Sequence, residues 1–558
     1  MNWPEIYLAM IQSGEETVSA KVRAVYEREV GFMKNPPKDF PYYFDPERGE
    51  HHIGFIEKFC RTSKGSKNAA KKLIRLEPFQ KAKLQLVFGW VEKETNFRRF
   101  REVDDYRGRK CGKSTETAAV EWDVALNDGE FGAEIYCTAN KKDQAKIIYN
   151  ECVNMRNISN ALAAVSRKRQ SDIYIEAYMS YIMALAADTR TMDGLNTHFF
   201  SMDEFHAAKN RSLYDIMIQS QTARDQPLAW LISTNGFERD GFFDEQYEYD
   251  SNVAMWTPGY QDLRLLPLIY ELDRREEWEA PECWAKANPG LGKIKKIKTL
   301  AEFVEKAHRQ PSFLPTVLTK DFNVAENSAE SWLSLEKVTN LTVVPMEYLR
   351  NSYAVGGCDL SSTTDLTCAT LLIRKPGDSR FFVLQKYFLP KSKVSMNEHN
   401  DKREAPYQKW AENEWVEICD GATVDFHAVT EWFVMMVREY NIRPLYIGYD
   451  AALSGYWREE MDAYGFDMRK IRQGPFTWTY PMKELEGMFE ENRIVYNNNP
   501  VLRWCLSNTG KKSNNKDGIE SIQPVKINTK RRIDGTVSLL NAFTCFKDNE
   551  EEYMHYIK

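Results

Sequence analysis

Residues 106–115 constrain this chain more than any other stretch, because they read Tyr-Arg-Gly-Arg-Lys-Cys-Gly-Lys-Ser-Thr and stand directly before a helix-forming run. Gly-Lys-Ser at the start of a helix is typical of a phosphate-binding loop, in which backbone N–H groups and the helix N-terminus face the phosphates. Lys113 would then reach the β and γ oxygens of a nucleoside triphosphate, and the Ser114 hydroxyl would bind Mg²⁺. The spacing departs from the usual pattern, since Arg107 stands at the first glycine position and Gly108 comes one residue late. Taken alone, the segment leaves a chance surface loop open as the alternative.

The composition places the chain among ordinary soluble globular proteins. Its 558 residues, 43% of them hydrophobic and 28% charged, are enough for two or three domains with a large core. No apolar run approaches the roughly 20 residues that span a bilayer, the start carries no export leader, and the ten cysteines form no Cys-x-x-Cys pair. We therefore expect a protein of a reducing cytoplasm without membrane contact. A formal net charge of −6 argues against coating nucleic acid over the whole surface but does not exclude local contact.

Strand and helix patterns alternate after the loop. Residues 114–126 predict a helix, residues 133–139 a strand and residues 142–153 a helix, and this alternation predicts a parallel sheet. A further apolar run then ends in Asp203 and Glu204. At the end of a buried strand, the first carboxylate would orient the Mg²⁺ shell and the second would position or deprotonate the attacking water. A strand that simply meets solvent is the alternative for this pair.

Two weaker signals flank this core. The apolar run 228–232 leads into Ser233, Thr234 and Asn235, a polar tip that could sense hydrolysis beside the γ-phosphate, or could be an ordinary turn. Upstream, Gln80 follows Pro78 and Phe79 at the start of a helix. Its amide offers both a donor and an acceptor to an adenine edge, although Pro-x-Gln is also a common helix start.

In order and spacing, four segments resemble the large terminase subunit of tailed bacteriophages: residues 109–114 (Arg-Lys-Cys-Gly-Lys-Ser), 202–206 (Met-Asp-Glu-Phe-His), 233–235 (Ser-Thr-Asn) and 284–290 (Trp-Ala-Lys-Ala-Asn-Pro-Gly). That family also lacks the first loop glycine, so the irregular spacing agrees with the resemblance. The resemblance implies that Gln80 reads adenine and that Arg109 contacts the γ-phosphate. It implies a nucleotide-binding set of Gln80, Gly108, Arg109, Lys110, Cys111, Gly112, Lys113, Ser114, Thr115 and Asp203. Residues 103–106, Val-Asp-Asp-Tyr, are more polar than the strand expected before the loop, which leaves the edge of the sheet undetermined.

A second group of carboxylates lies beyond a polar connector near residue 330. Asp359 and Asp450 each end an apolar strand pattern, and Asp534 stands just before the predicted helix 536–546. The strands predicted at 353–360, 366–373 and 380–388 resemble the opening of the RNase H-like nuclease fold. The three aspartates are spaced as in the nuclease domain of the same family, and Asp365 matches a further acidic position. Two-metal phosphodiester hydrolysis needs several carboxylates around ions about 3.5 to 4 Å apart. A solvated strand end remains the alternative for each aspartate alone.

The resemblance implies an α/β protein in two parts. We expect a helical segment at residues 1–65, a P-loop ATPase domain with a mainly parallel sheet at 66–325, a linker at 326–345, and an RNase H-like, mixed α/β nuclease domain at 346–558. The cofactors would be ATP and Mg²⁺, with Mn²⁺ as a substitute in the nuclease site.

The implied function is a viral DNA-packaging motor, which drives double-stranded DNA into the procapsid with ATP and cuts concatemeric DNA with a metal-dependent endonuclease. The partners would be a small terminase subunit, the portal ring and further copies of the chain docked on it, in the cytoplasm of the infected host rather than in the virion. A transposase or integrase on the same nuclease fold is an alternative, which a complete ATPase argues against. A structural protein with relict motifs is another, which the retained carboxylates argue against.

Overall fold

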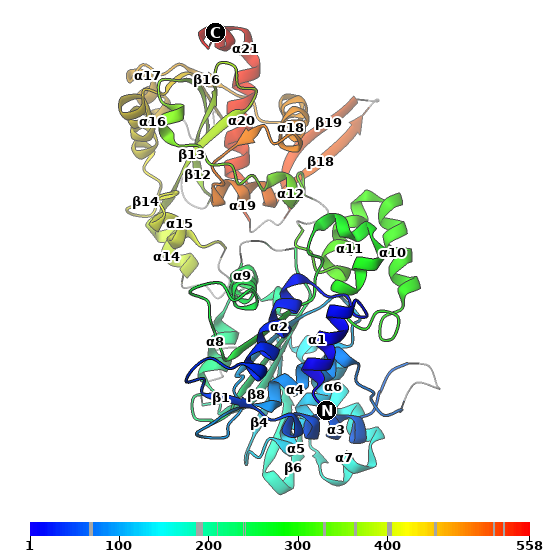
Figure 1. Ribbon diagram of the computed structural model, residues 1–558. Helices are drawn as coiled ribbons and strands as arrows, with labels where there is room; N and C mark the ends of the chain where they lie inside the picture. The colour runs from blue at the N-terminus through cyan, green and yellow to red at the C-terminus, as the bar shows by residue number, and fades with distance from the viewer. Residues whose placement is uncertain are drawn as a thin grey trace. The chain divides into compact units, whose positions relative to one another are not determined.

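The computed structural model describes the chain apart from residues 66–70, 186–193, 209, 238, 240, 327–330, 362–364, 399–403, 451–454, 517–518, 528–530 and 558, and apart from the side chains of residues 142 and 513–520. The chain forms two compact units, Met1–Ala325 and Glu326–Lys558 (Figure 1). None of the helices in the described ranges is long and apolar enough to cross a membrane.

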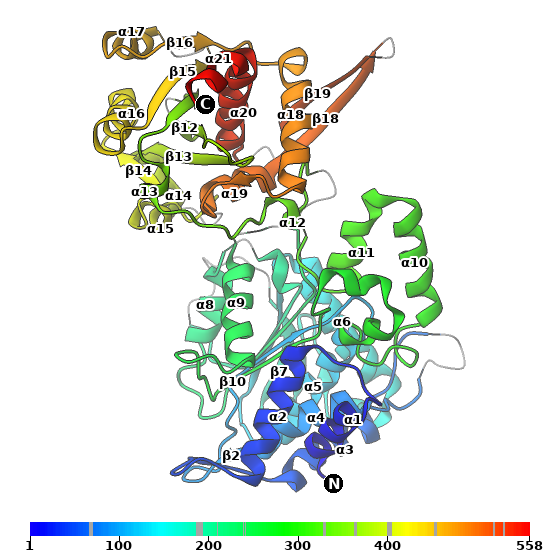
Figure 2. The same ribbon diagram turned by 45° about the horizontal axis from the view of Figure 1, so that its top comes forward.

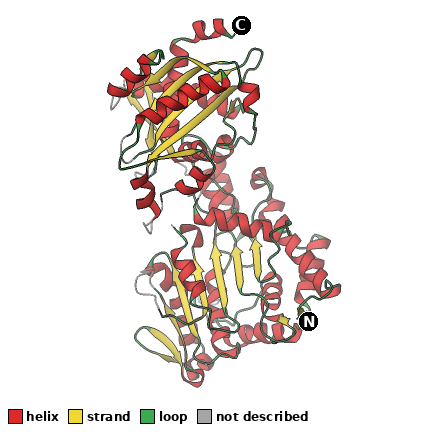
Figure 3. Cartoon of the chain, turned by 90° about the vertical axis from the view of Figure 1, so that its left-hand side faces the viewer, coloured by secondary structure: helices red, strands yellow, loops and turns green. Residues whose placement is uncertain are grey.

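The first unit is built on an eight-stranded sheet with the order β10-β3-β9-β8-β4-β7-β6-β5 (Figure 3). The strands are β3 (Glu102–Tyr106), β4 (Glu134–Ala139), β5 (Arg167–Lys168), β6 (Asp172–Ile175), β7 (Ser180–Ala184), β8 (Thr197–Asp203), β9 (Leu228–Ser233) and β10 (Leu265–Ile269). All neighbours from β10 to β7 run parallel, and only β6 and β5 pair antiparallel. The carboxyl ends of β3, β9 and β8 therefore meet at one edge, where parallel sheets of this kind carry their ligand sites.

Helices cover both faces of this sheet (Figure 2). Side chains alternate between the faces, so that Ile135 and Trp230 join a core with the helices of one face, whereas Tyr136 and Leu231 pack toward the other. The first face holds α1 (Trp3–Ser13), α2 (Ala20–Lys34), α3 (Pro46–Phe59), α4 (Pro78–Gly89), α5 (Lys113–Asn127), α6 (Lys142–Ile158) and α7 (Asn160–Ala164), and the second holds α8 (Ser212–Gln219) and α9 (Phe242–Ala254). A two-stranded ribbon pairs β1 (Tyr42–Phe44) with β2 (Trp90–Glu92).

The N-terminal helices belong to the core of the first unit. Tyr7, Tyr26 and Ile53 are buried in the same cluster as the sheet, and the Ser19 hydroxyl donates to the carbonyl of Ile269, 2.6 Å away. After β10, residues 272–324 form a smaller cluster around α10 (Ile297–Arg309) and α11 (Leu314–Asp321). This cluster also holds Trp284, within the segment that the sequence analysis singled out.

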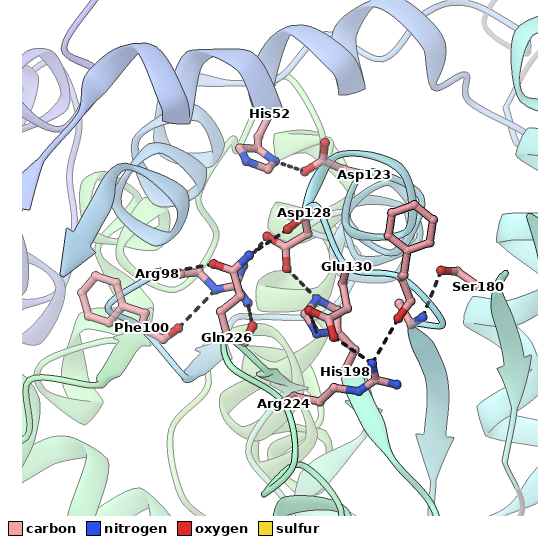
Figure 4. Close-up of polar contacts among 12 residues, drawn as sticks. His52, Arg98, Phe100, Asp123, Asp128, Glu130, Ser180, His198, Arg224 and Gln226 are labelled. Carbon is pink, nitrogen blue, oxygen red and sulfur yellow. Dashed lines mark hydrogen bonds and ion pairs between the residues drawn. The ribbon is translucent and has the colours of Figure 1, made fainter. Parts of the chain in front are cut away.

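A buried polar network ties the end of α5 to the start of β8 (Figure 4). Asp128 accepts two hydrogen bonds of 2.7 Å, one on Oδ1 from Arg98 Nη1 and one on Oδ2 from His198 Nε2. All three residues are buried. Gln226 completes it by donating to the backbone carbonyl of Asp128 at 2.7 Å. Because buried charges are tolerated only when paired, this network fixes how the helix meets the sheet.

The second unit is built on a mixed sheet with the order β14-β13-β12-β11-β15-β16. Its strands are β11 (Tyr353–Asp359), β12 (Thr367–Arg374), β13 (Phe381–Pro390), β14 (Val416–Cys419), β15 (Arg443–Tyr449) and β16 (Met468–Lys470), with β17 (Ile494–Val495) beside β13. β11, β12 and β13 are antiparallel neighbours, whereas β15 runs parallel to β11. A separate hairpin joins β18 (Thr509–Lys516) to β19 (Ile519–Lys526).

Two helical layers cover this second sheet, with α16 and α20 on opposite sides of it (Figure 2). Val355 and Leu372 pack with α20, whereas their neighbours Ala354 and Leu371 pack with α16. The helices are α12 (Leu335–Val338), α13 (Met346–Leu349), α14 (Lys391–Glu398), α15 (Tyr407–Glu412), α16 (Phe426–Tyr440), α17 (Gly455–Ala463), α18 (Pro475–Glu490), α19 (Pro500–Asn508), α20 (Asp534–Asp548) and α21 (Glu550–Tyr556).

The fold class expected from the sequence is confirmed, with a mainly parallel sheet in the first unit and a mixed sheet in the second. The polar segment before the loop is a strand after all. β3 lies between β10 and β9, inside the sheet, where Lys83 and Arg107 form ion pairs with Asp105.

Candidate nucleotide and nuclease sites

Gly108 explains the irregular spacing of the phosphate loop. A Cβ at this position would lie 2.5 Å from the carbonyl oxygen of Asp321 and 2.6 Å from Asn288 Oδ1, so only glycine fits there. The Gly108 N–H also donates to the carbonyl of Ala287 at 2.9 Å. The loop needs its glycine at position 108 because the chain passes there against residues 287, 288 and 321.

Arg107, at the usual glycine position, is buried beneath the loop and holds it. Its Nη1 donates to the carbonyl of Cys111 at 3.2 Å. Its Nη2 donates to Asp105 Oδ2 at 2.7 Å and to Glu116 Oε2, in the first turn of α5, at 2.8 Å. Gly112 precedes α5 with φ +81°, a left-handed conformation that glycine adopts without strain.

Lys113 bends back over the loop. Its Nζ donates to the carbonyls of Arg107 and, at 3.2 Å, Gly108, and burial lowers its pKa to about 8. The same Nζ that donates to these two carbonyls is a charged donor of the kind that binds phosphate oxygens. Ser114 and Thr115 follow in the first turn of α5.

The other loop residues divide into buried and exposed side chains. Cys111 is buried, with Sγ 3.5 Å from Asn288 Oδ1, whereas Arg109 and Lys110 are exposed. Across the described residues, no hydrogen bond or ion pair engages the Arg109 guanidinium, which leaves it available to a ligand or a neighbouring subunit.

The acidic pair lies at the same edge of the sheet. In the register, β8 pairs Asp203 with Ile232 of β9, and β9 pairs Ser233 with Tyr106 of β3. Burial, followed by the charge of Glu204, raises the pKa of Asp203 to about 6, while the charge of Lys113 lowers it. Glu204 has φ +52°, uncommon for a residue with a side chain, and its N–H donates to Asp203 Oδ1 at 2.9 Å. A buried carboxylate with uncompensated negative charge fits a divalent cation.

The polar tip after β9 is anchored on both sides. The N–H of His206 donates to Ser233 Oγ at 2.9 Å, and the N–H of Asn235 donates to Asn323 Oδ1 at 2.6 Å. Thr234 is buried between them. The polar tip therefore contacts both the turn that follows β8, through His206, and the segment that follows α11, through Asn323.

Gln80 uses both ends of its amide within the chain. Its Oε1 accepts from the N–H of Glu77 at 3.0 Å in a capping box, and its Nε2 donates to Glu116 Oε2 at 3.0 Å. An adenine-reading role would require these contacts to be exchanged, so this role stays a prediction.

In the second unit, two strand ends bring carboxylates together. β11 ends at Asp359 and pairs in parallel with β15, with Cys358 opposite Tyr449, so Asp359 and Asp450 leave the sheet at one edge. Asp534 is the first residue of α20, which crosses the same strands.

Two glycines allow α20 to approach these strands. A Cβ on Gly357 would lie 2.4 Å from the backbone N of Ala542 and 2.4 Å from the carbonyl oxygen of Ser538, and one on Gly448 would lie 2.7 Å from the carbonyl oxygen of Asn541. Across this contact, the Ser538 hydroxyl donates to the carbonyl of Gly357 at 3.0 Å. Close packing of helix on strand thereby places Asp534 beside Asp359.

The carboxylates of this second group repel one another. Burial, followed by the charges of Asp534 and Asp450, raises the pKa of Asp359 well above its usual range. Burial and the charge of Asp365 raise the pKa of Asp534 to about 7. Asp534 Oδ2 is buried, and no hydrogen-bond partner for it exists among the described residues.

This arrangement fits a divalent metal ion, which would supply the missing positive charge. Among the described residues, no group of three His, Cys, Asp or Glu side chains is already arranged to hold a metal ion.

Asp365 differs from the other three aspartates, because cations already neutralise it. Lys526 Nζ lies 3.0 Å from Asp365 Oδ2, and Arg532 forms an ion pair with Oδ1. Arg532 also pairs with Glu404.

Sequence reasoning missed two polar residues near Glu204. His206 lies within the Met-Asp-Glu-Phe-His motif without a role of its own, and Lys320 lies in no motif, yet the Nζ of Lys320 lies 2.9 Å from His206 Nε2. The two are 114 positions apart, so no local pattern could have paired them.

Comparison with known proteins gives two family matches. The ATPase domain model of the terminase large subunit matches residues 78–252, and its endonuclease domain model matches residues 261–550, more than half of the chain. The second match begins inside the first compact unit, upstream of its end at Ala325.

The sequence identity between this chain and individual relatives is low. The large terminase subunit of Enterobacteria phage HK97 is 25% identical over 88% of this chain and 94% of that protein. Protein YmfN of Escherichia coli is 27% identical over 63% of this chain and 78% of that protein. A crystal structure of the HK97 large terminase covers 89% of this chain and 99% of that chain, at 23% identity and a TM-score of 0.45.

Proposed function

We propose, since this chain belongs to the large terminase subunits and is a phage DNA-packaging motor with ATPase and endonuclease activities, that each activity resides in one compact unit. The ATPase domain is assigned to residues 66–325, preceded by the helical segment 1–65, and the nuclease domain to residues 346–558, with 326–345 as the linker. The phosphate loop lies wholly before this linker and the aspartates lie wholly after it.

In the ATPase, the loop from Gly108 to Thr115 holds the triphosphate, with Lys113 on the β and γ oxygens and Arg109 at the γ-phosphate. Ser114 and Asp203 hold the Mg²⁺ ion, which supplies positive charge to the phosphates when bound. Glu204 positions and deprotonates the attacking water. Residues 233–235 sense hydrolysis at the γ-phosphate and couple it to the rest of the motor. The observation that carries this assignment is the register of β3, β9 and β8, which sets loop, tip and acidic pair at one edge.

In the nuclease, Asp359, Asp450 and Asp534 would hold divalent metal ions, Mg²⁺ with Mn²⁺ as a substitute, and the bound ions would supply positive charge for activating water and stabilising the leaving oxygen of the cut strand. The support is the orphaned Asp534 oxygen beside Asp359. Asp365 could join them once it leaves Lys526 and Arg532, and we assign it a secondary place.

We further propose that the motor acts in the cytoplasm of the infected host, as a ring of copies on the portal, with a small terminase subunit that selects DNA. Terminase function implies DNA and packaging partners. A transposase or integrase is disfavoured, because the ATPase model matches in front of the nuclease model.

Two substitutions test the ATPase assignment. Lys113→Ala should abolish ATP hydrolysis and weaken nucleotide binding, since it removes charge from the β and γ phosphates. Glu204→Gln should abolish hydrolysis but retain binding, because only the base is lost. Affinity for a fluorescent ATP analogue and steady-state turnover are measured side by side for both. Turnover near the parent rate in Glu204→Gln would remove the role given to that residue.

A further inference from the structure

Lys320, at the end of α11, contacts three parts of the ATP site at once. Its carbonyl oxygen accepts from the N–H of Arg109 in the phosphate loop at 2.7 Å. Its Nζ donates to the carbonyl of Asn235 in the polar tip at 2.9 Å, and lies 2.9 Å from His206 Nε2. His206 follows Glu204 by two positions. One buried lysine therefore joins the loop, the tip and the turn that carries the acidic pair.

The contact with Lys320 fixes which nitrogen of His206 carries a proton. An ammonium group only donates, so Nε2 must accept, and the proton of a neutral imidazole then lies on Nδ1. Burial, followed by the charge of Lys320, lowers the pKa of His206 to about 3, and burial lowers that of Lys320 to about 8. At neutral pH the imidazole is therefore uncharged and the ammonium is charged.

The protonated nitrogen faces the acidic turn. His206 Nδ1 lies 3.2 Å from Glu204 Oε2 and 3.0 Å from Ser233 Oγ. The Ser233 hydroxyl donates to the carbonyl of Thr234 at 2.7 Å, so toward His206 it acts as an acceptor. The Nδ1–H therefore donates its hydrogen bond to Ser233 Oγ, and Glu204 Oε2 lies close enough to the same nitrogen for electrostatic attraction.

The backbone keeps the imidazole in this position. A Cβ on Gly236 would lie 2.8 Å from His206 Cδ2, so the absence of a side chain at 236 makes room for the ring. The Glu204 side chain is less restrained, because it is 30% exposed. A carboxylate of this kind needs a neighbouring group to hold one rotamer.

We propose that Lys320 and His206 are positioning residues for Glu204: the Lys320 ammonium fixes the Nδ1–H tautomer of His206, and the partial positive charge of that N–H holds the Glu204 carboxylate where it deprotonates the attacking water. The inference rests on the role of Glu204 as the base. Outer partners that orient a metal ligand commonly contribute about 10- to 100-fold to activity, and we expect an effect of that size for partners that orient a base.

The test uses the full-length chain, with kcat and KM for ATP measured in the presence of double-stranded DNA. Lys320→Met and His206→Phe should lower kcat about 10- to 100-fold with KM within about 2-fold of the parent, because nucleotide contacts remain. His206→Asn should retain most of kcat, since its amide nitrogen takes the place of Nδ1 as donor. Lys306→Met is the matched control: this lysine lies on α10 over the ring of Phe313, and its loss should leave both constants unchanged.

The outcomes separate this inference from the function on which it rests. Parent-like kcat in Lys320→Met and His206→Phe, with Glu204→Gln inactive, overturns the positioning role and leaves the base in place. A raised KM with unchanged kcat in Lys320→Met also overturns it, because Lys320 would then act only through the phosphate loop. If Lys320→Met does not fold, the two His206 variants decide: equal activities overturn the inference, and an active Asn beside an inactive Phe supports it. Activity in Glu204→Gln would instead remove the proposed base itself.

Discussion

Replacing Gly357 with alanine should damage the nuclease selectively. The added Cβ would meet backbone atoms of α20 at 2.4 Å, and ordinary contact begins near 3.4 Å. Either β11 or α20 must therefore move by about 1 Å, since the obstacle is backbone and cannot rotate away. Asp359 lies two residues further along β11 and Asp534 begins α20, so the two carboxylates shift relative to each other.

The size of the effect follows from this shift. A displacement of about 1 Å in reacting groups can cost about 10²-fold in rate. Overpacking of this kind costs about 1 to 3 kcal/mol in unfolding free energy. ATP hydrolysis should be unchanged, because the loop and the acidic pair belong to the other unit.

The assay is plasmid nicking with Mg²⁺ or Mn²⁺, alongside ATP turnover and thermal unfolding. Gly487→Ala in α18 is the control, because nothing lies within 4 Å of a Cβ there. This control should gain about 0.5 to 1 kcal/mol as a helix interior position and cut DNA normally. Parent-like nicking and stability in Gly357→Ala would refute the claim that close packing of α20 sets the metal ligands.

Three further predictions concern the first unit. Arg109→Ala should lower ATP turnover by about 10³- to 10⁵-fold, as expected for an arginine at a γ-phosphate; recovery on mixing with Lys113→Ala subunits would show that the arginine acts across an interface instead of within its own chain. Asp128→Asn should lower the unfolding free energy of this unit by about 3 to 5 kcal/mol in urea, because it leaves Arg98 buried without its counter-charge; an unchanged midpoint would contradict the network in Figure 4. Burial alone would raise the pKa of Asp128, but Arg98 and His198 hold it below its usual range, so its stabilisation is present above the unfolded pKa of about 3.9 and lost below it. The stability difference between the parent and Asp128→Asn should therefore narrow as the pH falls below about 4, and a constant difference down to pH 2 would contradict this.

Local patterns predicted the strand ends well. Asp203, Asp359 and Asp450 each follow a mainly apolar run, and a run of that kind indicates a buried strand that ends in a polar residue at the sheet edge. The order of strand and helix was sufficient for a parallel sheet in the first unit, and hairpin spacing was sufficient for the antiparallel opening of the second.

Long-range contacts were not predictable in this way. The polar β3 is an interior strand in which Asp105 pairs with Lys83, from α4, and with Arg107, and no pattern within residues 103–106 signals the contact with α4. The place of Lys320 beside His206 likewise depends on how α11 folds back on the sheet edge. The need for glycine at 357 became visible only once α20 was seen to cross β11.

The central claim is that one chain carries two chemically independent sites. It is tested most directly by measuring both DNA-stimulated ATP turnover and metal-dependent plasmid nicking in Glu204→Gln and in Asp359→Asn, beside the parent chain. Each substitution changes a carboxylate to an amide of nearly the same size. We expect Glu204→Gln to lose ATP turnover and retain nicking, and Asp359→Asn to lose nicking and retain ATP turnover. Loss of both activities in either folded variant, or undiminished nicking in Asp359→Asn, would contradict the account.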